Sequence, residues 1–167
     1  MFRIGLLSDT HGFYDIRIAG YFSHCNEIWH AGDIGGMDVV EKLEKIAPVV
    51  AVHGNIDDTS IRVRFPEHQR LNREGLDIWM THIGGYPGRY ASHVRSVIRN
   101  DPPGLFISGH SHILKIMPDK KLGLLHMNPG AAGRYGLHRV RTMIRFEVDS
   151  GKVHNVDVIE LGPRAPD

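Results

Sequence analysis

Metal-binding side chains recur at short spacings throughout this 167-residue sequence. The chain has twelve histidines, and histidine is the commonest metal ligand in proteins. Seven oxygen and nitrogen donors stand out, in five short segments: Asp9 with His11, Asp33, Asn55, His82, and His110 with His112. Residues i and i+2 of an extended segment point to the same side, so each closely spaced pair can face one centre. The pattern predicts a metal site assembled from distant parts of the chain.

The number of donors indicates what such a site can do. Seven donors exceed the needs of one cation, but they suit two cations about 3.5–4 Å apart that share a carboxylate. We expect Asp33 to be the bridge. Two cations in this arrangement polarise phosphoryl oxygens and lower the pKa of a shared water, so that hydroxide is available near neutral pH. The chemistry expected is hydrolysis of a phosphate ester.

The donor segments all follow predicted strands. Short apolar runs end just before each of them, at residues 2–8, 27–31, 48–53, 76–81 and 104–108. Helical patterns lie between strands, at residues 15–23, 37–46 and 90–99. This alternation favours parallel strands, whose carboxyl ends converge on one crevice. Five distant segments can therefore build one site.

The last third of the chain has a different pattern. Short apolar runs at residues 115–118, 122–127, 142–148 and 152–159 are separated by turn residues. They predict antiparallel hairpins, and Asp149-Ser150-Gly151 is the clearest turn. The tail from Gly162, with two prolines, is expected to be loose.

Composition bounds the class of protein. A length of 167 residues favours one domain, residues 1–167, with a single core. The net charge of +1 argues against a dedicated nucleic-acid-binding or membrane surface. Cys25 is the only cysteine, which excludes an intramolecular disulfide and a thiolate zinc cluster. We find neither a secretion signal nor a run of about 18 apolar residues, and therefore expect a cytoplasmic protein with no membrane partner.

The order of the motifs resembles that of the calcineurin-like metallophosphoesterase superfamily. The motifs are Ser8-Asp9-Thr10-His11, Gly32-Asp33, Gly54-Asn55, Thr81-His82 and Gly109-His110-Ser111-His112. The short length and Asn128-Pro129-Gly130 are most similar to the small bacterial and archaeal phosphodiesterases of that group. The resemblance implies an α/β (α+β) fold, a sandwich of two mixed β-sheets flanked by helices, with metals at the strand ends.

The resemblance also implies a role for each ligand. Asp9, His11 and His112 would hold one metal. Asn55, His82 and His110 would hold the other, with Asp33 between them. Asp33, Asn55 and His82 are the residues we also expect to act in catalysis. Manganese is common in such enzymes, while ligand type leaves iron, zinc, magnesium, nickel and cobalt open.

Two positions depart from the family pattern. Many members carry a histidine after the glycine-asparagine pair, where it assists the leaving group, and the small phosphodiesterases often carry cysteine. This chain has Ile56 there, which excludes histidine acid catalysis from that position. The other departure is Ile83 with Gly84, in a segment where family members often place a second histidine. It concerns the substrate side of the pocket.

The other histidines and Asp57 are expected to support the ligands or to have ordinary structural positions. His30, His53 and Asp57 stand close to Asp33 and Asn55 in sequence and are candidates for supporting the ligands. The remaining histidines have no motif around them, and we expect surface or core positions: His24, His68, His93, His126, His138 and His154. Each predicted ligand, considered alone, could also have a structural role in place of metal binding, such as helix capping by Asp9. Those alternatives do not explain why every donor segment follows a strand.

The leading prediction is a phosphodiesterase acting on a small phosphate ester. A phosphomonoesterase or a nuclease is the alternative within enzymes, although nuclease relatives usually carry extra domains. A catalytically silent scaffold of the retromer-subunit type is the alternative from another class, but that branch has lost ligands that this chain retains. The sequence leaves the substrate open, and a homo-oligomer is possible.

Overall fold

Two five-stranded sheets make up the centre of the molecule, described by a computed structural model for residues 1–165. The first sheet has the order β12 (Lys152–Pro163), β11 (Val140–Asp149), β1 (Phe2–Leu7), β2 (Glu27–His30), β3 (Val49–Ala51). The second has the order β4 (His68–Arg73), β5 (Leu76–Thr81), β8 (Leu105–Ile107), β10 (Leu124–Pro129), β9 (Leu114–Asp119). A short ribbon pairs β6 (Gly85–Tyr86) with β7 (Arg89–Tyr90).

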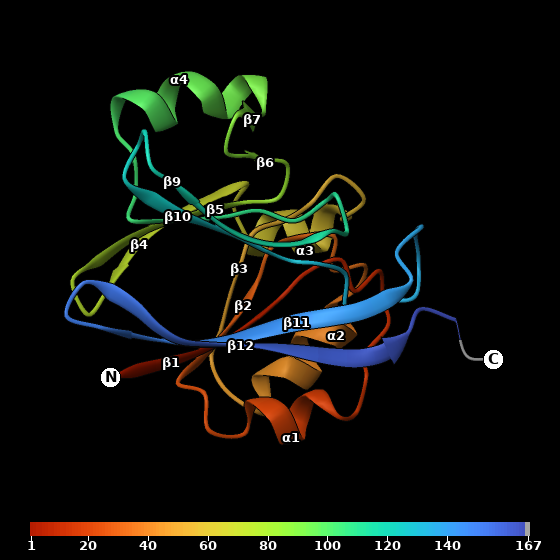
Figure 1. Ribbon diagram of the computed structural model, residues 1–167. Coiled ribbons are helices and arrows are strands. Elements are labelled where there is room, and N and C mark those ends of the chain that lie inside the picture. Colours follow the sequence, from red (N-terminus) through yellow and green to blue (C-terminus); the bar gives the residue numbers. More distant parts are fainter. Residues whose placement is uncertain (166–167) are drawn as a thin grey trace.

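Helices cover the outer faces of the two sheets (Figure 1). The four helices are α1 (Ile18–Phe22), α2 (Met37–Glu44), α3 (Thr59–Arg64) and α4 (Ser92–Asn100). The first two pack on the outer side of the first sheet, where Phe22 and Leu43 join Leu7 in one buried cluster. Val94 of α4 packs with Phe106 on the outer side of the second sheet. The predicted sandwich of two mixed sheets flanked by helices is confirmed.

The main core lies between the sheets. Leu6 and Trp29 from the first sheet and Met80 and Ile107 from the second belong to one buried cluster. Leu7, the neighbour of Leu6, instead faces the helices. Strand β1 is thus apolar on both faces, which is why its sequence is a continuous apolar run, as is typical of central parallel strands.

The central strands of each sheet run parallel. Strand β2 pairs in parallel with β1 and β3, and β8 does so with β5 and β10. Antiparallel strands occupy the margins, where β11 and β12 form a hairpin beside β1, and β4 and β9 form the edges of the second sheet. The loops after β1, β2 and β3 therefore leave one sheet at the same end, and those after β5 and β8 do so in the other.

The short β6–β7 ribbon was not expected from the sequence, and neither were helix α3 and strand β4. Helix α3 is short and buries only Ile61, so its apolar periodicity is weak. Asp58 begins it by accepting a hydrogen bond from the Ile61 N–H at 3.2 Å. Strand β4 is an edge strand of mostly polar residues that turns into β5 at Glu74 and Gly75, both with positive φ. Neither α3 nor β4 carries the apolar pattern on which the predicted elements rested.

Several boundaries also differ from expectation. The first helix spans only Ile18–Phe22 instead of residues 15–23, because Asp15 binds Arg17 and Arg141. The expected loose tail from Gly162 is wrong in its first residues, since β12 continues to Pro163 and pairs with β11. Pro166 and Asp167, which end that tail, lie outside the described residues.

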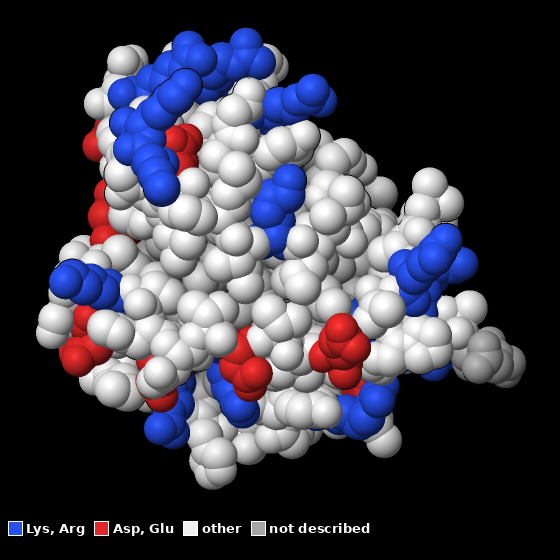
Figure 2. Space-filling model, viewed as in Figure 1, with Lys and Arg blue, Asp and Glu red and all other residues white. Residues whose placement is uncertain are grey.

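Charged side chains are unevenly distributed on the face drawn in Figure 2. Lysine and arginine gather over α4, where Arg95, Arg99 and Lys121 line a hollow with Asp119. Side chains without charge cover most of the middle of this face. Among residues 1–165 there is no helix of the length and apolarity needed to cross a membrane. Burial raises the pKa of Cys25 to about 11, in keeping with a packing role.

Candidate metal centre

Loops from both sheets bring six of the predicted ligands together as two groups. In each group, one ligand atom from every residue lies within 4.8 Å of the others. The first group is Asp9, His11 and His112, and the second is Asp33, His82 and His110. The loops after β1 and β2 supply the carboxylates and His11, whereas the loops after β5 and β8 supply the other histidines. The site thus lies where the two sheets meet.

Asp9 is held so that one of its oxygens is free. Its Oδ2 accepts hydrogen bonds from the Ser8 hydroxyl at 2.6 Å and from the His110 N–H at 3.1 Å. Its Oδ1 is buried and has no hydrogen bond to any described residue. Three imidazole Nε2 atoms surround Oδ1, at 3.2 Å (His112), 3.8 Å (His82) and 3.9 Å (His11). A buried carboxylate oxygen without a donor is costly, and a cation beside it would remove that cost.

His82 is oriented by the backbone of the first sheet. Its Nδ1–H donates to the carbonyl oxygen of Ala31 at 2.7 Å, which leaves Nε2 as the nitrogen with a free lone pair. The Nε2 atoms of His82 and His11 are both buried, and within residues 1–165 neither has a hydrogen-bond partner. These are the positions from which imidazole coordinates a metal.

Asp33 lies between the two groups. Its Oδ1 is 3.2 Å from His82 Nε2, and its Oδ2 is 3.5 Å from His11 Nε2. Burial opposes ionisation, but His82 and the Ile56 N–H, which donates to Oδ1 at 3.1 Å, hold the pKa of Asp33 below its ordinary value. Burial likewise opposes charge on His82, whose pKa is nevertheless raised by Asp33 and Asp9. Asp33 is an ionised carboxylate with one oxygen toward each group.

The backbone of the ligand loops is strained. Eight non-glycine residues within residues 1–165 have positive φ, and five of them are predicted ligands: Asp9 (55°), His11 (46°), Asp33 (53°), His110 (68°) and His112 (59°). Left-handed backbone costs a non-glycine residue on the order of 1 kcal/mol and concentrates at functional sites. The strain aims these side chains at a common centre.

Glycines before the ligands allow the loops to approach closely. A Cβ at Gly54 would collide with Asp33 Oδ1, and one at Gly109 would collide with Ser8 Oγ. These glycines are required by the packing of neighbouring loops, which explains why the motifs contain glycine before Asn55 and His110.

Comparison with known proteins agrees with this geometry. The model of the calcineurin-like phosphoesterase superfamily domain matches residues 2–151. The chain belongs to this superfamily. It is also 29% identical, over 133 residues, to a probable metallophosphoesterase of Methanothermobacter thermautotrophicus, an alignment that covers 77% of this chain and 76% of that protein. The resemblance stated from the motifs is therefore confirmed.

Solved structures share the calcineurin-like fold. A Vps29 variant from Entamoeba histolytica superposes with a TM-score of 0.72 at 16% sequence identity. The superposition covers 96% of this chain and 100% of the Vps29 chain. A novel archaeal phosphodiesterase has a TM-score of 0.67 at 21% identity, with coverage of 95% and 100%. At these identities the similarity shows the fold alone.

Asn55 follows Gly54, which packs directly against Asp33. Asn55 is exposed and lines a polar pocket with His53, Arg62 and His82. The adjacent Ile56 N–H ties this loop to Asp33. Coordination by Asn55 stays a prediction.

Two of the three expected supporting residues lie behind the ligand loops of this phosphoesterase. Asp57 is buried and accepts the N–H groups of Gly35 at 2.8 Å and Gly54 at 2.7 Å, so it joins the loops after β2 and β3. His30 accepts the Gly32 N–H at 3.2 Å and contacts the Thr10 hydroxyl at 2.9 Å. Burial lowers the pKa of His30 to about 4.

The third supporting residue, His53, has a different place. Its Nδ1 contacts the Phe65 carbonyl oxygen at 2.9 Å, and its ring lines the polar pocket. Of the three residues, only His53 therefore borders space that a substrate can occupy.

Two residues near the centre were missed by sequence reasoning. The Tyr135 ring lies 4.9 Å from the His11 ring, and the His138 ring lies 5.2 Å from the His112 ring. His138 Nε2 contacts the Gly133 carbonyl oxygen at 2.9 Å. Both residues stand in the loop that follows Asn128-Pro129-Gly130, an arginine-rich segment in which no metal-binding motif points to them.

Proposed function

We propose that this calcineurin-like protein is a metal-dependent phosphodiesterase that hydrolyses a small phosphate ester with two divalent cations, manganese being the first candidate. One observation carries the proposal. Asp33 offers one carboxylate oxygen to each donor group, while Asp9 Oδ1, His11 Nε2 and His82 Nε2 are buried and unpaired within residues 1–165. Such an arrangement fits two nearby cations better than it fits a packed core.

The chain's donors divide between the two positions. Asp9, His11 and His112 would hold one cation; Asn55, His82 and His110 would hold the other; and Asp33 would contact both. Cations bound there supply Lewis acidity toward the phosphoryl oxygens and an activated water. The residues themselves fix the geometry: Ala31 holds the His82 tautomer, and Ser8 with the His110 N–H turns Asp9 Oδ1 toward the centre.

The surroundings of His110 favour a diester over a monoester. His110 is exposed and lies beside His82, with ring centres 5.3 Å apart. A polar pocket with Asn55 and Arg62 lies on the His82 side, and a mostly apolar cavity lies next to His110 itself. Ile83 lines both hollows. A phosphodiester has two organic groups, and two hollows beside the metal centre can accept one each.

A protein-interaction scaffold is the second candidate. Exposed isoleucines, Ile56 and Ile83, lie next to predicted ligands and would suit contact with another protein. Fold similarity to Vps29 does not separate the candidates. The buried, unpaired metal-type donors favour the enzyme, since a scaffold has no need to keep them.

The test combines metal content with hydrolysis. We expect the manganese-loaded protein to bind two ions and to cleave bis(p-nitrophenyl) phosphate faster than p-nitrophenyl phosphate. Asp33→Ala should abolish activity and reduce both sites, whereas Asp38→Ala, an exposed carboxylate paired with Lys42, should do neither. Absence of bound metal after incubation with excess manganese would contradict the proposal. Two bound ions without hydrolysis of any ester would favour the scaffold.

The ligand assignment has its own test. His112→Ala should chiefly deplete the cation held by Asp9 and His11, and His110→Ala the one held with His82. Anomalous difference maps of the two variants distinguish the positions. Equal loss from both positions in both variants would count against the assignment.

A further inference from the structure

Isoleucine follows four of the predicted ligands directly; Ile34 is buried, and the other three isoleucines are exposed. Ile56 is 46% exposed, Ile83 39% and Ile113 61%. Large apolar side chains gathered at the mouth of a polar site indicate that part of the natural ligand is apolar. Ile83 and Ile113 line the cavity that lies next to His110.

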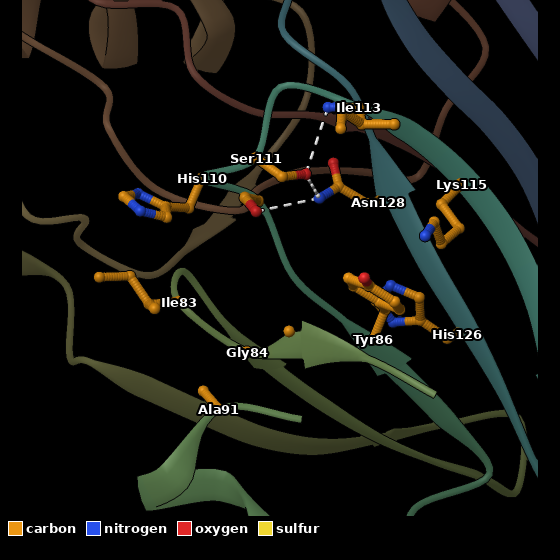
Figure 3. A pocket seen from close by; sticks show the side chains of 12 residues that line it. Ile83, Gly84, Tyr86, Ala91, His110, Ser111, Ile113, Lys115, His126 and Asn128 are labelled. Carbon is orange, nitrogen blue, oxygen red and sulfur yellow. Dashed lines mark hydrogen bonds between the residues drawn. The ribbon is translucent and has the colours of Figure 1, made fainter. Parts of the chain in front are cut away.

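This cavity, of about 200 Å³, shares a wall with the metal centre. His110 and the neighbouring Gly109 backbone contribute to that wall. Figure 3 shows Ile83, Gly84 and Tyr86 on one side and Ser111, Ile113 and Lys115 on the other. Pockets for drug-sized ligands usually enclose roughly 300–1,000 Å³, so this one suits a single ring system whose remaining part lies elsewhere.

Two polar side chains, Lys115 and His126, lie at one end of the cavity, with the Tyr86 ring beside them. The Lys115 ammonium nitrogen is 3.6 Å from the centre of the Tyr86 ring, and the two lie beside His126 (Figure 3). His126 is buried, and its Nδ1 contacts the Phe106 carbonyl oxygen at 3.1 Å, so Nδ1 carries the proton of the neutral ring. Burial lowers the pKa of His126 to about 4 and keeps the ring neutral near pH 7. Lys115 is a donor, and His126 Nε2 is an acceptor.

Two other polar side chains of the wall, Asn128 and Ser111, hold the surrounding loop. Asn128 Nδ2 donates to the Gly109 carbonyl oxygen at 2.9 Å and to Ser111 Oγ at 3.1 Å. Asn128 Oδ1 accepts the Gly130 N–H at 2.9 Å, and Ser111 Oγ also accepts the Ile113 N–H at 3.2 Å. These bonds fix the loop that carries His110. Lys115 and His126, together with the Tyr86 hydroxyl, are then the side-chain groups best placed to recognise a ligand.

We propose that this cavity binds a planar heteroaromatic group of the nucleobase class, in an ester whose phosphate lies at the metal centre. The position of the phosphate rests on the proposed function. The faces of such a ring are apolar and match Ile83 and Ile113, while its edge offers both acceptors and donors to Lys115 and His126. An alkyl chain would leave both polar groups desolvated and without partners, which weakens binding.

Binding by the zinc-loaded protein tests the proposal without relying on turnover. Isothermal titration calorimetry would compare adenosine 5′-monophosphate, ribose 5-phosphate and octyl phosphate. We expect the adenosine ester to bind at least about tenfold more tightly than ribose 5-phosphate. Equal affinity of these two ligands would overturn the proposal. Tighter binding of octyl phosphate than of the adenosine ester would overturn it as well, in favour of an aliphatic ligand.

Variants locate the effect in the cavity. Lys115→Met and Ile113→Asn should each remove most of the advantage of the base and leave the affinity for ribose 5-phosphate unchanged. Lys121→Met makes the same substitution on an exposed lysine outside this cavity and should change neither affinity. Retention of the full base preference in both cavity variants would overturn the assignment to this cavity.

The two proposals fail in different ways. Hydrolysis of diesters without any base preference would sink the cavity proposal alone. A base preference that Lys115→Met removes, in a protein that cleaves no ester, would refute the proposed enzyme and support the cavity.

Discussion

Ile56 follows Asn55, next to the candidate metal centre. If the proposed function holds, a side chain able to donate a proton from this position would assist the leaving group. Few other residues could donate a proton to the leaving group instead. Both oxygens of Asp57 accept backbone N–H groups, and His30 is fully buried and neutral near pH 7. His53 alone among these lines the polar pocket, but its Nδ1–H donates to the Phe65 carbonyl oxygen, so Nε2 of the neutral ring has no proton to give. Leaving-group protonation in this chain is therefore expected to be weak or absent.

The dependence of rate on leaving-group pKa measures this directly. In the parent protein the rate should fall steeply as leaving-group pKa rises, because the departing oxygen carries charge without a proton. Ile56→His should flatten the slope, since general acid assistance contributes about 10²–10⁴-fold and matters most for poor leaving groups. The measurement is a plot of log kcat for a series of substituted phenyl diesters under conditions where chemistry limits the rate.

Ile56→Leu is the matched control and should keep the parent slope. A shallow slope in the parent would contradict the expectation, because it would mean that another residue already donates the proton. His53→Gln would then be the first variant to examine.

At the scale of elements, the loops after the parallel strands must fit against one another to place the ligands. Asp57 joins the loops after β2 and β3, and Gly54 presses directly on Asp33. The arrangement leaves no room for even one additional methyl group at position 54. Metal affinity is therefore expected to depend on residues that do not touch the metal.

Gly54→Ala tests this dependence. Its Cβ would meet Asp33 Oδ1 and backbone N, so the loop or Asp33 must move. We expect metal affinity to fall about 10–100-fold, as is typical when the residues that orient ligands are altered. Titration of the metal-free protein with zinc gives the affinity. Gly20→Ala in α1, where an added Cβ meets nothing within 4 Å, should bind metal normally and gain up to about 1 kcal/mol in stability. Unchanged affinity in Gly54→Ala would contradict the expectation.

Asp15 links the segment before α1 to Arg141 of β11, and this link should make stability depend on pH. Asp15 is buried and accepts hydrogen bonds from Arg17 Nη2 at 2.6 Å and from buried Arg141 Nη1 at 2.9 Å. Chiefly through Arg17, this holds the pKa of Asp15 below its ordinary value of 3.8. A depressed pKa contributes stability at pH values above the unfolded pKa, and that contribution is lost as pH falls through the folded pKa.

Asp15→Asn should therefore destabilise the protein by about 3 kcal/mol at pH 7, because Arg141 loses its buried partner. The difference from the parent should shrink as pH falls below about 4, where the Asp15 carboxylate of the unfolded chain takes up a proton while that of the folded protein stays ionised. Urea unfolding at pH 7 and at several lower pH values provides the comparison. A difference that stays constant across this range would show that the charge of Asp15 is not the cause.

The sequence predicted the elements that have a buried apolar face and missed those that lack one. Runs before Asp9 and His82 are apolar because β1 and β5 lie in the cores, so their ends could be located. Strand β4 is a polar edge, and α3 buries a single side chain. That six of the predicted ligands lie close together could be predicted, because the motif residues follow strand ends. The contact of Tyr135 with His11 was not predictable. It depends on the path of the long loop between β10 and β11, which reaches the loop after β1.

For the molecule as a whole, the metal centre joins the two sheets. Loops of the first sheet carry Asp9, His11 and Asp33. Loops of the second sheet carry His82, His110 and His112. Between the sheets, away from the centre, the contact is made by apolar side chains. Cations bound to ligands from both sheets would therefore hold the sandwich together at this end, and an unfolded chain would offer no comparable site.

Metal binding should consequently raise the melting temperature. A ligand at a hundredfold excess over its Kd stabilises the folded state by about 2.7 kcal/mol. For a chain of this size, each kcal/mol corresponds to roughly 2–4 °C. We expect a rise of about 5–10 °C for each cation, reversed by a chelator and measurable by calorimetry. Asp33→Ala should lose most of the rise because it weakens both positions and so the link between the sheets, while Asp38→Ala should retain it. The same rise in Asp33→Ala and in the parent would show that cations bind elsewhere, and no rise at saturating metal would show that the folded state gains nothing from this site.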